Sequence, residues 1–576
     1  MNDISIDRRA FIGGGAALAA AAGLQPAWAA TTSHGLTAAK SQGLLSGEDI
    51  RMTVSELNFR VDGRPGHAIG INGTIPAPLV RLKEGQNVRI TVDNQLDEDT
   101  SIHWHGLIVP FHMDGVPGIS FPGIRARSSF TYEFPVRQSG TYWYHSHSGL
   151  QEQLGHYGPI IIDPAGPDPI AHDREHVIVL SDWTFMHPHR LFTRLKQEGG
   201  VFNRNRRTLA NRGEDKMSAK EAREFARMRM DPTDISDVTA AAYTYLINGH
   251  SPGENWTGLF RAGERVRLRL INAAAQTIFN IRIPGLKLLV VATDGIAVRP
   301  VEVDELQIGN AETYDLIVVP ENRAYSLIAE GIDRSGMGVA TLAPQAGMRA
   351  AVPPLRKRPT LTMTDMGMGA MDHGSMDHSA HGDAASSAPA MSHDMRDKSK
   401  VDFKVGPGVD MIAPMPMDRV GDPGVGLDDV GHKVLTYKDL VALTPNSDTR
   451  VPTRRIDIHL TGNMERFMWS MDGEKLSENP EPYRFARNER VRLRMINDTM
   501  MTHPMHLHGH FFEIVNGNPG NQPLKHTIRV LPGGYVDVDL TADAPGDWAF
   551  HCHLLYHMHA GMMRVVSVRP LEGAEA

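Results

Sequence analysis

One segment pattern occurs three times in this 576-residue chain and limits the folds that it can adopt. Each copy joins a turn tripeptide to a segment in which apolar residues alternate and the last residue is asparagine. The copies are residues 71–73 with 85–94, 247–249 with 263–272, and 471–473 with 488–497. Alternation with a period of two is typical of a half-buried β-strand. The pattern therefore predicts three related β domains, and short strands between Gly- and Pro-containing turns favour β-sandwiches.

The spacing of the copies predicts the domain limits and a long insertion. Counted from the equivalent Val88, Val266 and Val491, the third copy is delayed by about 47 residues. Residues 363–395 account for most of this delay, with seven Met, four His and no aromatic residue in 33 positions. So little apolar surface cannot offset the entropy lost on ordering. We predict domains at 45–165, 172–350 and 401–572, and a disordered Met/His-rich insertion at 360–400.

A second, smaller insertion lies in the middle domain, where residues 201–231 are polar and basic. Ser218 is followed three residues later by Glu221, which is a capping-box pattern and predicts the start of a helix. We expect a small helical insertion here. Its basic charge is interpreted as a solvated helix face rather than a binding patch.

The N-terminal residues 1–29 have the pattern of a targeting signal. Arg8 and Arg9 precede an apolar stretch at 13–24, and Ala27-Trp28-Ala29 is a small-x-small cleavage site. Paired arginines indicate Tat export, with an ordinary secretory signal as the alternative. The stretch is too short to anchor the chain in a bilayer. We expect a periplasmic protein without a membrane anchor.

Composition excludes several function classes. Lys+Arg 59 against Asp+Glu 67 gives a net charge of −8, which argues against a nucleic-acid partner. One cysteine permits neither an intramolecular disulfide nor a Cys-rich zinc site. The 28 His and 29 Met are clustered, and imidazoles and thioethers beside a single thiol indicate copper.

Four His-x-His pairs occupy equivalent positions in the first and third copies. The pairs are His103/His105, His145/His147, His506/His508 and His551/His553. The middle copy has Ile281 and Ile283 where the first pair would be. Alternate residues of a strand face the same side, so each pair presents two imidazoles together. One such pair alone could be two surface histidines, but four indicate a multinuclear metal site where the first and third domains meet.

Cys552 lies between His551 and His553, so its side chain is expected on the opposite face of the strand. There it can meet His503 and His557, with Met562 close by. Two imidazoles, a thiolate and a weak thioether form the blue-copper ligand set. Zinc is the weaker choice, because closed zinc sites seldom use a thioether. Backbone and thiolate would join this site to the cluster through His551 and His553, which suits one-electron oxidation coupled to the reduction of dioxygen to water.

The four histidine motifs resemble the copper-binding segments of multicopper oxidases, the family of laccases, ascorbate oxidase and bacterial cuprous oxidases. The resemblance covers nearly the whole mature chain. The Tat signal, the Met/His insertion and the run at 551–558 are most similar to the copper-resistance subgroup of the CopA/PcoA type. The resemblance implies an all-β fold of three cupredoxin-like Greek-key sandwiches and four coppers per chain.

The resemblance also implies a role for each candidate ligand. The type 2 copper ligands would be His103 and His506. The type 3 ligands would be His105, His145, His147, His508, His551 and His553. The type 1 ligands would be His503, Cys552, His557 and Met562, with Met563 expected to face the other way.

Two acidic positions bear on proton delivery. Relatives carry an acidic residue near Asp114 that helps deliver protons to the cluster, as a carboxylate can. A simple Asp-Gly turn with Gly115 is the alternative. A second acid that some relatives place just after the last type 1 histidine is absent, because Met558 and His559 follow His557.

The methionines suggest Cu(I) as a substrate. Thioethers favour Cu(I), so Met363, Met366, Met368, Met371, Met376, Met391 and Met395 are expected to capture it, with a low-complexity tether as the alternative. Met464, Met468 and Met471 are interpreted as core or strand residues, and Trp104 and Trp143 as packing residues.

We therefore expect a copper-resistance oxidase that uses Cu(I) and O2, with phenols as secondary substrates and periplasmic copper carriers as partners. A copper-sequestering protein with incidental oxidase activity and a laccase that acts on organic substrates are the alternatives.

Overall fold

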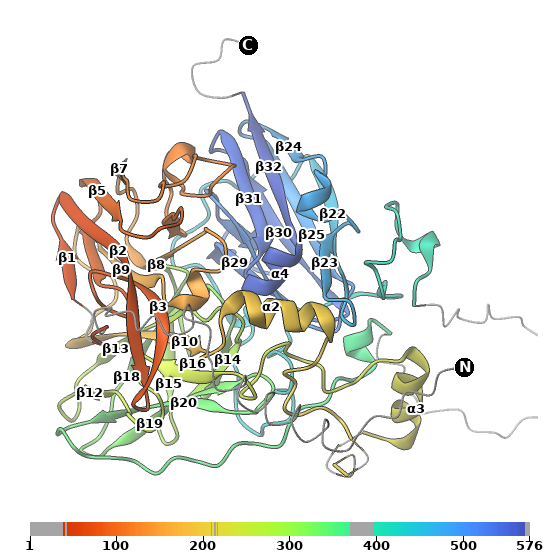
Figure 1. The fold of residues 1–576 in the computed structure, drawn as a ribbon, viewed down its shortest axis with the longest axis horizontal. Coiled ribbons are helices and arrows are strands. Elements are labelled where there is room, and N and C mark those ends of the chain that lie inside the picture. Colours follow the sequence, from red (N-terminus) through yellow and green to blue (C-terminus); the bar gives the residue numbers. More distant parts are fainter. Residues whose placement is uncertain are drawn as a thin grey trace, which may run out of the picture. The chain divides into compact units, whose positions relative to one another are not determined.

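The computed structural model describes residues 38–40, 43–208, 210, 211, 213, 215, 217–368 and 395–570. Its β-strands form three successive pairs of sheets (Figure 1). The predicted signal at 1–29 lies outside the described residues. Among the helices of the described part of the chain, none is long and apolar enough to cross a membrane.

The first pair of sheets is built from strands between Leu44 and Asp163. One sheet has the order β1 (Leu44–Ser46), β4 (Leu79–Lys83), β9 (Tyr157–Asp163), β8 (Gly140–His145) and β6 (His103–His105). The other has the order β3 (Arg64–Ile71), β2 (Asp49–Val61), β5 (Asn87–Asn94) and β7 (Ser129–Pro135).

The second pair of sheets is built from strands between Arg174 and Ala343. Its six-stranded sheet has the order β11 (Thr244–Ile247), β10 (Arg174–Trp183), β13 (Val266–Asn272), β18 (Thr313–Val318), β15 (Leu288–Thr293) and β16 (Ile296–Val303). The five-stranded sheet has the order β12 (Thr257–Leu259), β20 (Met337–Ala343), β19 (Tyr325–Gly331), β14 (Phe279–Arg282) and β17 (Glu305–Ile308).

The third pair of sheets ends the described chain. One sheet has the order β23 (Met468–Met471), β22 (Arg454–Asn463), β25 (Arg490–Asn497), β30 (Gly534–Thr541), β27 (Phe512–Ile514) and β28 (Leu524–Lys525), with β21 (Met417–Asp418) beside β30. The other has the order β24 (Tyr483–Ala486), β32 (Met563–Arg569), β31 (Gly546–Cys552), β26 (His503–Leu507) and β29 (Thr527–Val530). The prediction of three β-sandwich repeats is confirmed.

The repeated segment has the same place in each sandwich. β5, β13 and β25 each pair in parallel with an earlier strand and antiparallel with a later one. Each ends at an asparagine, Asn94, Asn272 or Asn497, whose side-chain amide donates to loop carbonyls. The carbonyl oxygen of each side chain accepts the backbone N–H two residues later. These buried hydrogen bonds fix the loop that leads to the next strand, and they explain why the pattern ends in asparagine.

In the described part of the chain, three α-helices accompany the sheets. α2 (Pro188–Gln197) and α3 (Ala219–Met228) lie in the middle segment of the chain, and α4 (Leu555–Ala560) follows β31. The predicted capping box starts α3, because Ser218 Oγ accepts from the Glu221 N–H and the Glu221 carboxylate accepts from the Ser218 N–H. α2 lies beside α4 (Figure 1), where the Phe192 ring stacks on Tyr556.

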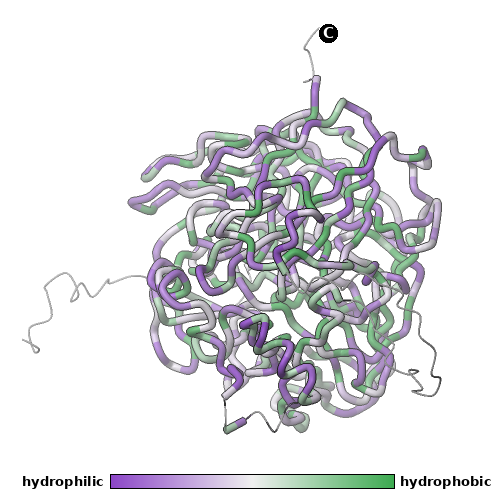
Figure 2. The backbone as a smooth tube through the Cα atoms, turned by 90° about the vertical axis from the view of Figure 1, so that its right-hand side faces the viewer, coloured by the Kyte–Doolittle hydropathy of each residue, from purple (hydrophilic) through white to green (hydrophobic). Residues whose placement is uncertain are grey.

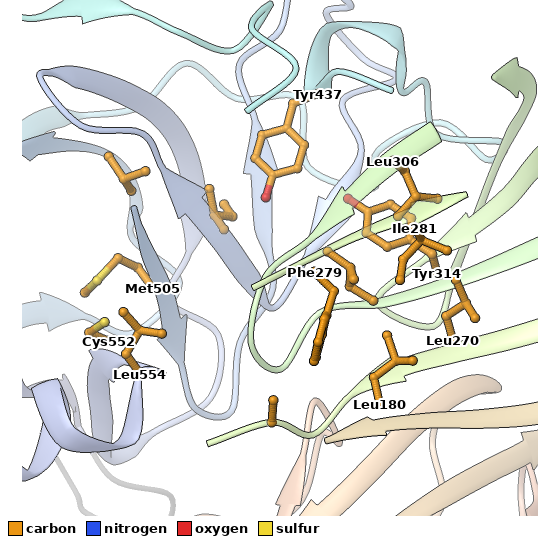
Figure 3. Close-up of a cluster of buried hydrophobic side chains, with 14 of the residues drawn as sticks. Leu180, Leu270, Phe279, Ile281, Leu306, Tyr314, Tyr437, Met505, Cys552 and Leu554 are labelled. Carbon is orange, nitrogen blue, oxygen red and sulfur yellow. The ribbon is translucent and has the colours of Figure 1, made fainter. Parts of the chain in front are cut away.

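Hydrophobic and hydrophilic residues are interspersed along the backbone (Figure 2). Buried and more exposed positions alternate along β5, as the sequence pattern predicts, whereas β13 is buried throughout. The largest buried cluster is continuous from the second to the third sandwich. Figure 3 shows Phe279 and Tyr314 on the middle sandwich, and Met505 and Cys552 on the third. Cys552 is therefore held in a packed apolar environment shared by two repeats.

Both ends of the predicted insertion at 360–400 pack against the protein. A 3₁₀ turn at Thr364–Met366 buries Met366, and Met395 is also buried. Both belong to a methionine-rich apolar cluster with Met411 and Met500. Residues 369–394, which include Met371, Met376 and Met391, lie outside the described residues.

Candidate metal centre

Eight imidazoles from the four His-x-His pairs lie together between the first and third sandwiches. They form three groups of closely spaced donor atoms: His103, His105 and His506; His105, His145 and His553; and His147, His508 and His551. Every group takes histidines from both sandwiches. In the described part of the chain, none of these groups includes a residue of the middle sandwich.

Strand register brings the pairs together. In the first sandwich His103 on β6 is the cross-strand partner of His145 on β8. In the third, His506 on β26 is the partner of His551 on β31. Two ring pairs then meet between the sandwiches. His105 stacks on His506 with centroids 3.8 Å apart, and His103 lies tilted against His508 with centroids 3.9 Å apart. The predicted convergence of the first and third repeats is thus present in the fold.

The imidazole nitrogens are oriented as a metal site requires. His103 Nδ1 donates to the Asp114 carbonyl at 2.7 Å, and His506 Nδ1 donates to the His526 carbonyl at 2.7 Å. The Nε2 atoms of both rings are buried and have no hydrogen-bond partner among the described residues. The hydrogen bond at Nδ1 therefore orients each ring so that its Nε2 faces the cluster.

Burial keeps these rings neutral. Desolvation, followed by the neighbouring imidazoles, lowers the pKa of His105, His506 and His508 well below the usual histidine range. The pKa of His551 is lowered to about 4, chiefly by burial. A neutral imidazole keeps one nitrogen lone pair, so the buried cluster offers several ligand atoms to a metal cation.

Two buried carboxylates contact the cluster rings. Asp114 follows the 3₁₀ turn Phe111–Met113, and its Oδ2 accepts from His508 Nδ1 at 2.9 Å while its Oδ1 lies 3.2 Å from His103 Nδ1. Glu152 Oε2 lies 2.6 Å from His145 Nδ1, and burial raises the pKa of Glu152 well above its usual range. The sequence singled out Asp114 but not Glu152, which lies five residues after a histidine pair.

Cys552 lies on the other face of β31, as predicted. Its Sγ is 3.5 Å from His503 Nδ1 and 3.9 Å from His557 Nδ1, and the two Nδ1 atoms are 3.3 Å apart. All three side chains are fully buried. Burial raises the pKa of the Cys552 thiol, so a bound cation is needed to favour the thiolate.

Each imidazole at Cys552 is held by its outer nitrogen. His503 Nε2 lies 2.7 Å from Thr499 Oγ1, and His557 Nε2 donates to Asp237 Oδ2 at 2.6 Å. Trp469 stacks on His557 with centroids 3.7 Å apart. These contacts direct both Nδ1 atoms toward the sulfur.

Met562 and Met563 belong to different parts of the core. Met562 is fully buried in the cluster that contains Cys552, and its carbonyl accepts the Cys552 N–H at 3.1 Å. Met563 is the cross-strand partner of His551 and packs with Val116 instead. Cross-strand partners share a face, so Met563 lies on the face of His551. This placement favours Met562 as the thioether neighbour of Cys552.

Comparison with known proteins decides the family. Multicopper oxidase family models match residues 53–166, 174–352 and 449–572. The chain is 47% identical to a copper resistance protein A homolog of Pseudomonas syringae pv. tomato, over 97% of this chain and 99% of the relative. It is 46% identical to copper resistance protein A of Escherichia coli, over 98% and 99% of the two chains. This chain belongs to the multicopper oxidase family.

Solved structures agree in fold with this multicopper oxidase. Fet3p, a multicopper oxidase that functions in iron import, superposes with a TM-score of 0.64 at 19% identity, covering 91% of this chain and 90% of Fet3p. The laccase of Botrytis aclada superposes with a TM-score of 0.62 at 20% identity, covering 92% and 88%. The predicted resemblance and the all-β, three-domain fold are confirmed.

The donor set of the multicopper oxidase fits the copper that its family implies. Buried imidazole nitrogens without partners among the described residues line the cluster, and a thiol lies beside two imidazoles and near a thioether. Imidazole suits copper in either oxidation state, and thiolate and thioether are soft donors. The Cys552 set is enclosed by the core.

Two contributors to the multicopper oxidase site could not be recognised from local motifs. Asp237 comes from the loop after α3, in the middle repeat, and holds His557. His526 is a further fully buried histidine beside the eight cluster imidazoles, with Nδ1 3.2 Å from His105 Nε2. Neither belongs to a His-x-His pair, so the repeat gives no signal for them.

A cavity of about 450 Å³ opens beside the Cys552 site of this multicopper oxidase. Five thioethers line it, from Met228, Met230, Met411, Met464 and Met500, together with carboxylates that include Asp234 and Asp410. Thr499, the partner of His503, is part of the wall. Met471 is a buried strand residue as expected, whereas Met464 lines the cavity.

Proposed function

We propose that the chain is a copper-dependent oxidase that holds four coppers. Three are proposed to bind the eight cluster imidazoles, with His103 and His506 as the type 2 ligands and the other six as the type 3 ligands. The fourth is proposed to bind His503, Cys552, His557 and Met562 as a type 1 site. The observation that carries this proposal is the set of buried, mutually facing donor atoms at the two sites.

Bound copper would supply one-electron oxidation at the Cys552 site and four-electron reduction of O2 to water at the cluster. The protein joins the two sites covalently, since Cys552 is flanked by His551 and His553. It also excludes water from Cys552, which is fully buried in the shared core. These features favour electron transfer without side reactions at the sulfur.

Asp114 is proposed to pass protons to the cluster. Its carboxylate is buried, accepts from His508 Nδ1, and lies beside His103. A carboxylate in contact with two cluster rings is close enough to transfer protons to oxygen held there, directly or through one water.

The cavity supports Cu(I) as the substrate. Thioethers are soft donors that prefer Cu(I), and five of them meet in one space. Both imidazoles at Cys552 are linked to the wall of this cavity. His503 contacts the wall residue Thr499. His557 donates to Asp237, whose negative charge raises the pKa of the wall residue Asp234. Burial, followed by the charges of Asp237 and Asp231, raises the pKa of Asp234 to about 8. The cavity is also lined by Arg206, Arg229 and Arg396, and the charge of Arg206 opposes this rise. A metal cation would add to that effect and favour the carboxylate form of Asp234.

The cellular role follows from this substrate. The relatives named copper resistance protein A and the twin-arginine pattern support a periplasmic, Tat-exported protein that oxidises Cu(I) to Cu(II) and so gives copper tolerance. Phenols remain candidate secondary substrates, periplasmic copper carriers remain candidate partners, and the Met/His segment a candidate site for additional Cu(I). Copper sequestration and laccase activity on organic substrates remain the competing functions.

Oxygen uptake by the copper-loaded protein, fed with chelator-buffered Cu(I), tests the proposal. Uptake should saturate with Cu(I) and be absent in Cys552→Ser. The double variant Met464→Leu/Met500→Leu should raise the KM for Cu(I) roughly tenfold, equivalent to about 1.4 kcal/mol of lost binding. Its turnover of an organic reductant should be unchanged.

Met52→Leu is the matched control, because Met52 is a buried thioether of the first sandwich. It should leave the KM for Cu(I) unchanged. Equal loss with Cu(I) and with the organic reductant would favour a laccase. Uptake that does not differ from Cys552→Ser, despite full copper loading, would favour sequestration.

A further inference from the structure

A short segment connects the cluster to the middle sandwich, although that sandwich supplies none of the eight cluster imidazoles. The segment is residues 525–527, from the last residue of β28 to the first residue of β29, and we call it the bracing segment. Its three side chains, Lys525, His526 and Thr527, are fully buried. A buried polar segment of this kind requires partners for all its groups.

One side of the bracing segment contacts the cluster. The His526 carbonyl accepts from His506 Nδ1 at 2.7 Å. His105 Nε2 lies 3.2 Å from both His526 Nδ1 and Thr527 Oγ1. The segment thus touches the two rings that stack on each other across the interface, His105 from the first sandwich and His506 from the third.

The other side of the bracing segment is held by Asp294, in the turn between β15 and β16 of the middle sandwich. Asp294 Oδ2 accepts the backbone N–H groups of His526 and Thr527, both at 3.1 Å. Asp294 Oδ1 accepts from the Thr313 N–H at 3.0 Å and pairs with Lys525 Nζ at 3.0 Å. Lys525 also pairs with Glu312 at 3.1 Å. Against the effect of burial, the charges of Asp294 and Glu312 raise the pKa of Lys525, so it stays protonated.

The contacts of His105 differ from those of His103 and His506. Those two rings donate outward from Nδ1 and leave Nε2 free on the cluster side. In His105 it is Nδ1 that is buried without a partner among the described residues, while Nε2 reaches the bracing segment. The proton of neutral His105 must therefore be on Nε2 for Nδ1 to act as a donor to a cation.

We propose that Asp294 is a positioning residue for the cluster: through the bracing segment it fixes His105 with Nδ1 toward the metal site and His506 with Nε2 toward it. The middle sandwich thereby sets the geometry of a cluster to which it gives no ligand. This inference rests on the proposed copper cluster. Its physical basis is that Asp294 satisfies four buried donors at once, so loss of one oxygen leaves donors unpaired and frees the segment to move.

Asp294→Asn tests the inference, because the amide keeps the size of the side chain but replaces an acceptor oxygen with a donor. Asp315→Asn is the matched control. Asp315 is also a buried carboxylate of the middle sandwich, and it binds Thr141, Arg267 and Arg269 rather than the bracing segment. Copper per chain, the type 2 electron paramagnetic resonance signal and thermal unfolding of the metal-free protein are measured for both.

We expect Asp294→Asn to lose at least half of its type 2 signal and one or more coppers per chain, with the blue absorption band retained. Asp315→Asn should destabilise the metal-free protein to a similar degree but keep the full signal. Equal signals in the two variants would overturn the inference. A parent protein that loads no cluster copper would instead refute the proposed function.

A second pair of variants tests the segment itself if Asp294→Asn fails to fold. His526→Asn keeps an acceptor oxygen near the position of Nδ1, whereas His526→Leu removes it and keeps the volume. We expect the near-ultraviolet absorption of the type 3 pair to be retained in His526→Asn and lost in His526→Leu. The same spectrum in both variants would contradict a role for His526 in orienting His105.

Discussion

Gly115 allows the Asp114 turn to approach the cluster strand closely, and substitution there should disturb the cluster but not the Cys552 site. Its φ is +87°, a conformation that a residue with a Cβ adopts with strain. A Cβ built at Gly115 would lie 1.8 Å from the carbonyl oxygen of Ile102 and 3.1 Å from the Cα of His103. Both are backbone atoms, so no side-chain rotation can relieve the contact.

The magnitude of the Gly115→Ala effect has two parts. The left-handed backbone costs an alanine about 1 to 2 kcal/mol. In addition, the turn and the strand must separate by roughly 1.5 to 2 Å to restore an ordinary van der Waals contact. His103 follows Ile102 directly, and Asp114 precedes Gly115, so this displacement acts on both ends of the His103–Asp114 hydrogen bond. A shift of about 1 Å in a positioned group can cost roughly 100-fold in rate.

Gly118→Ala is the matched control, because Gly118 has a φ of +80° in the same loop but no atom within 4 Å of its Cβ position. Gly118→Ala should show the backbone strain without a displacement of the turn from the strand. We expect Gly118→Ala to unfold at a slightly lower temperature and to reduce O2 normally. Gly115→Ala should lose cluster copper and O2 reduction yet keep the blue absorption of the Cys552 site. Full O2 reduction by Gly115→Ala would refute this reasoning.

Three further substitutions separate the roles proposed for the site. Cys552→Ser should abolish the blue colour and substrate oxidation while cluster copper stays bound, and metal analysis with absorption spectroscopy checks this; retained turnover would exclude the covalent path. Asp114→Asn should slow O2 reduction by roughly 100-fold with full copper content, whereas an unchanged rate in stopped-flow reoxidation would leave the residue as a turn former only. Asp237→Asn should raise the reduction potential at Cys552 by roughly 60 mV, because a neutral acceptor at His557 replaces a charged one at a difference of about 1.4 kcal/mol. A redox titration of the blue band measures it, with Asp234→Asn as the control, and equal potentials in the two variants would contradict the role of that hydrogen bond.

The histidine cluster could be predicted because its ligands repeat with the fold. A strand pattern fixed by alternation places His103 and His506 at the same position of two sandwiches, and strand geometry then puts the second residue of each pair on the same face. The opposite orientation of Cys552 follows from the same rule. Local periodicity was therefore sufficient to predict the positions of the ligands in the first and third repeats.

The contribution of the middle repeat could not be predicted, because it depends on contacts between distant segments. Asp237 meets His557 across 320 positions of the chain, and Asp294 meets His526 across 232. Neither residue lies in a motif, and both look like ordinary loop aspartates in the sequence. Their roles exist only once three sandwiches have packed, which is a property of tertiary structure rather than of local pattern.

The same contacts explain why a repeat without ligands remains part of the oxidase. A metal site between two sandwiches needs their relative position fixed to a fraction of an ångström, and two sheets in contact at one interface can still slide. The middle sandwich binds the third through the salt bridges of Lys525 and through the hydrogen bond of Asp237 to His557. It binds the first through the hydrogen bond that the Thr313 hydroxyl donates to the Thr141 carbonyl. Because the middle sandwich binds both of the others, the relative position of the first and third sandwiches depends on three interfaces instead of one. The positions of the ligands are therefore determined by contacts that lie outside the metal site.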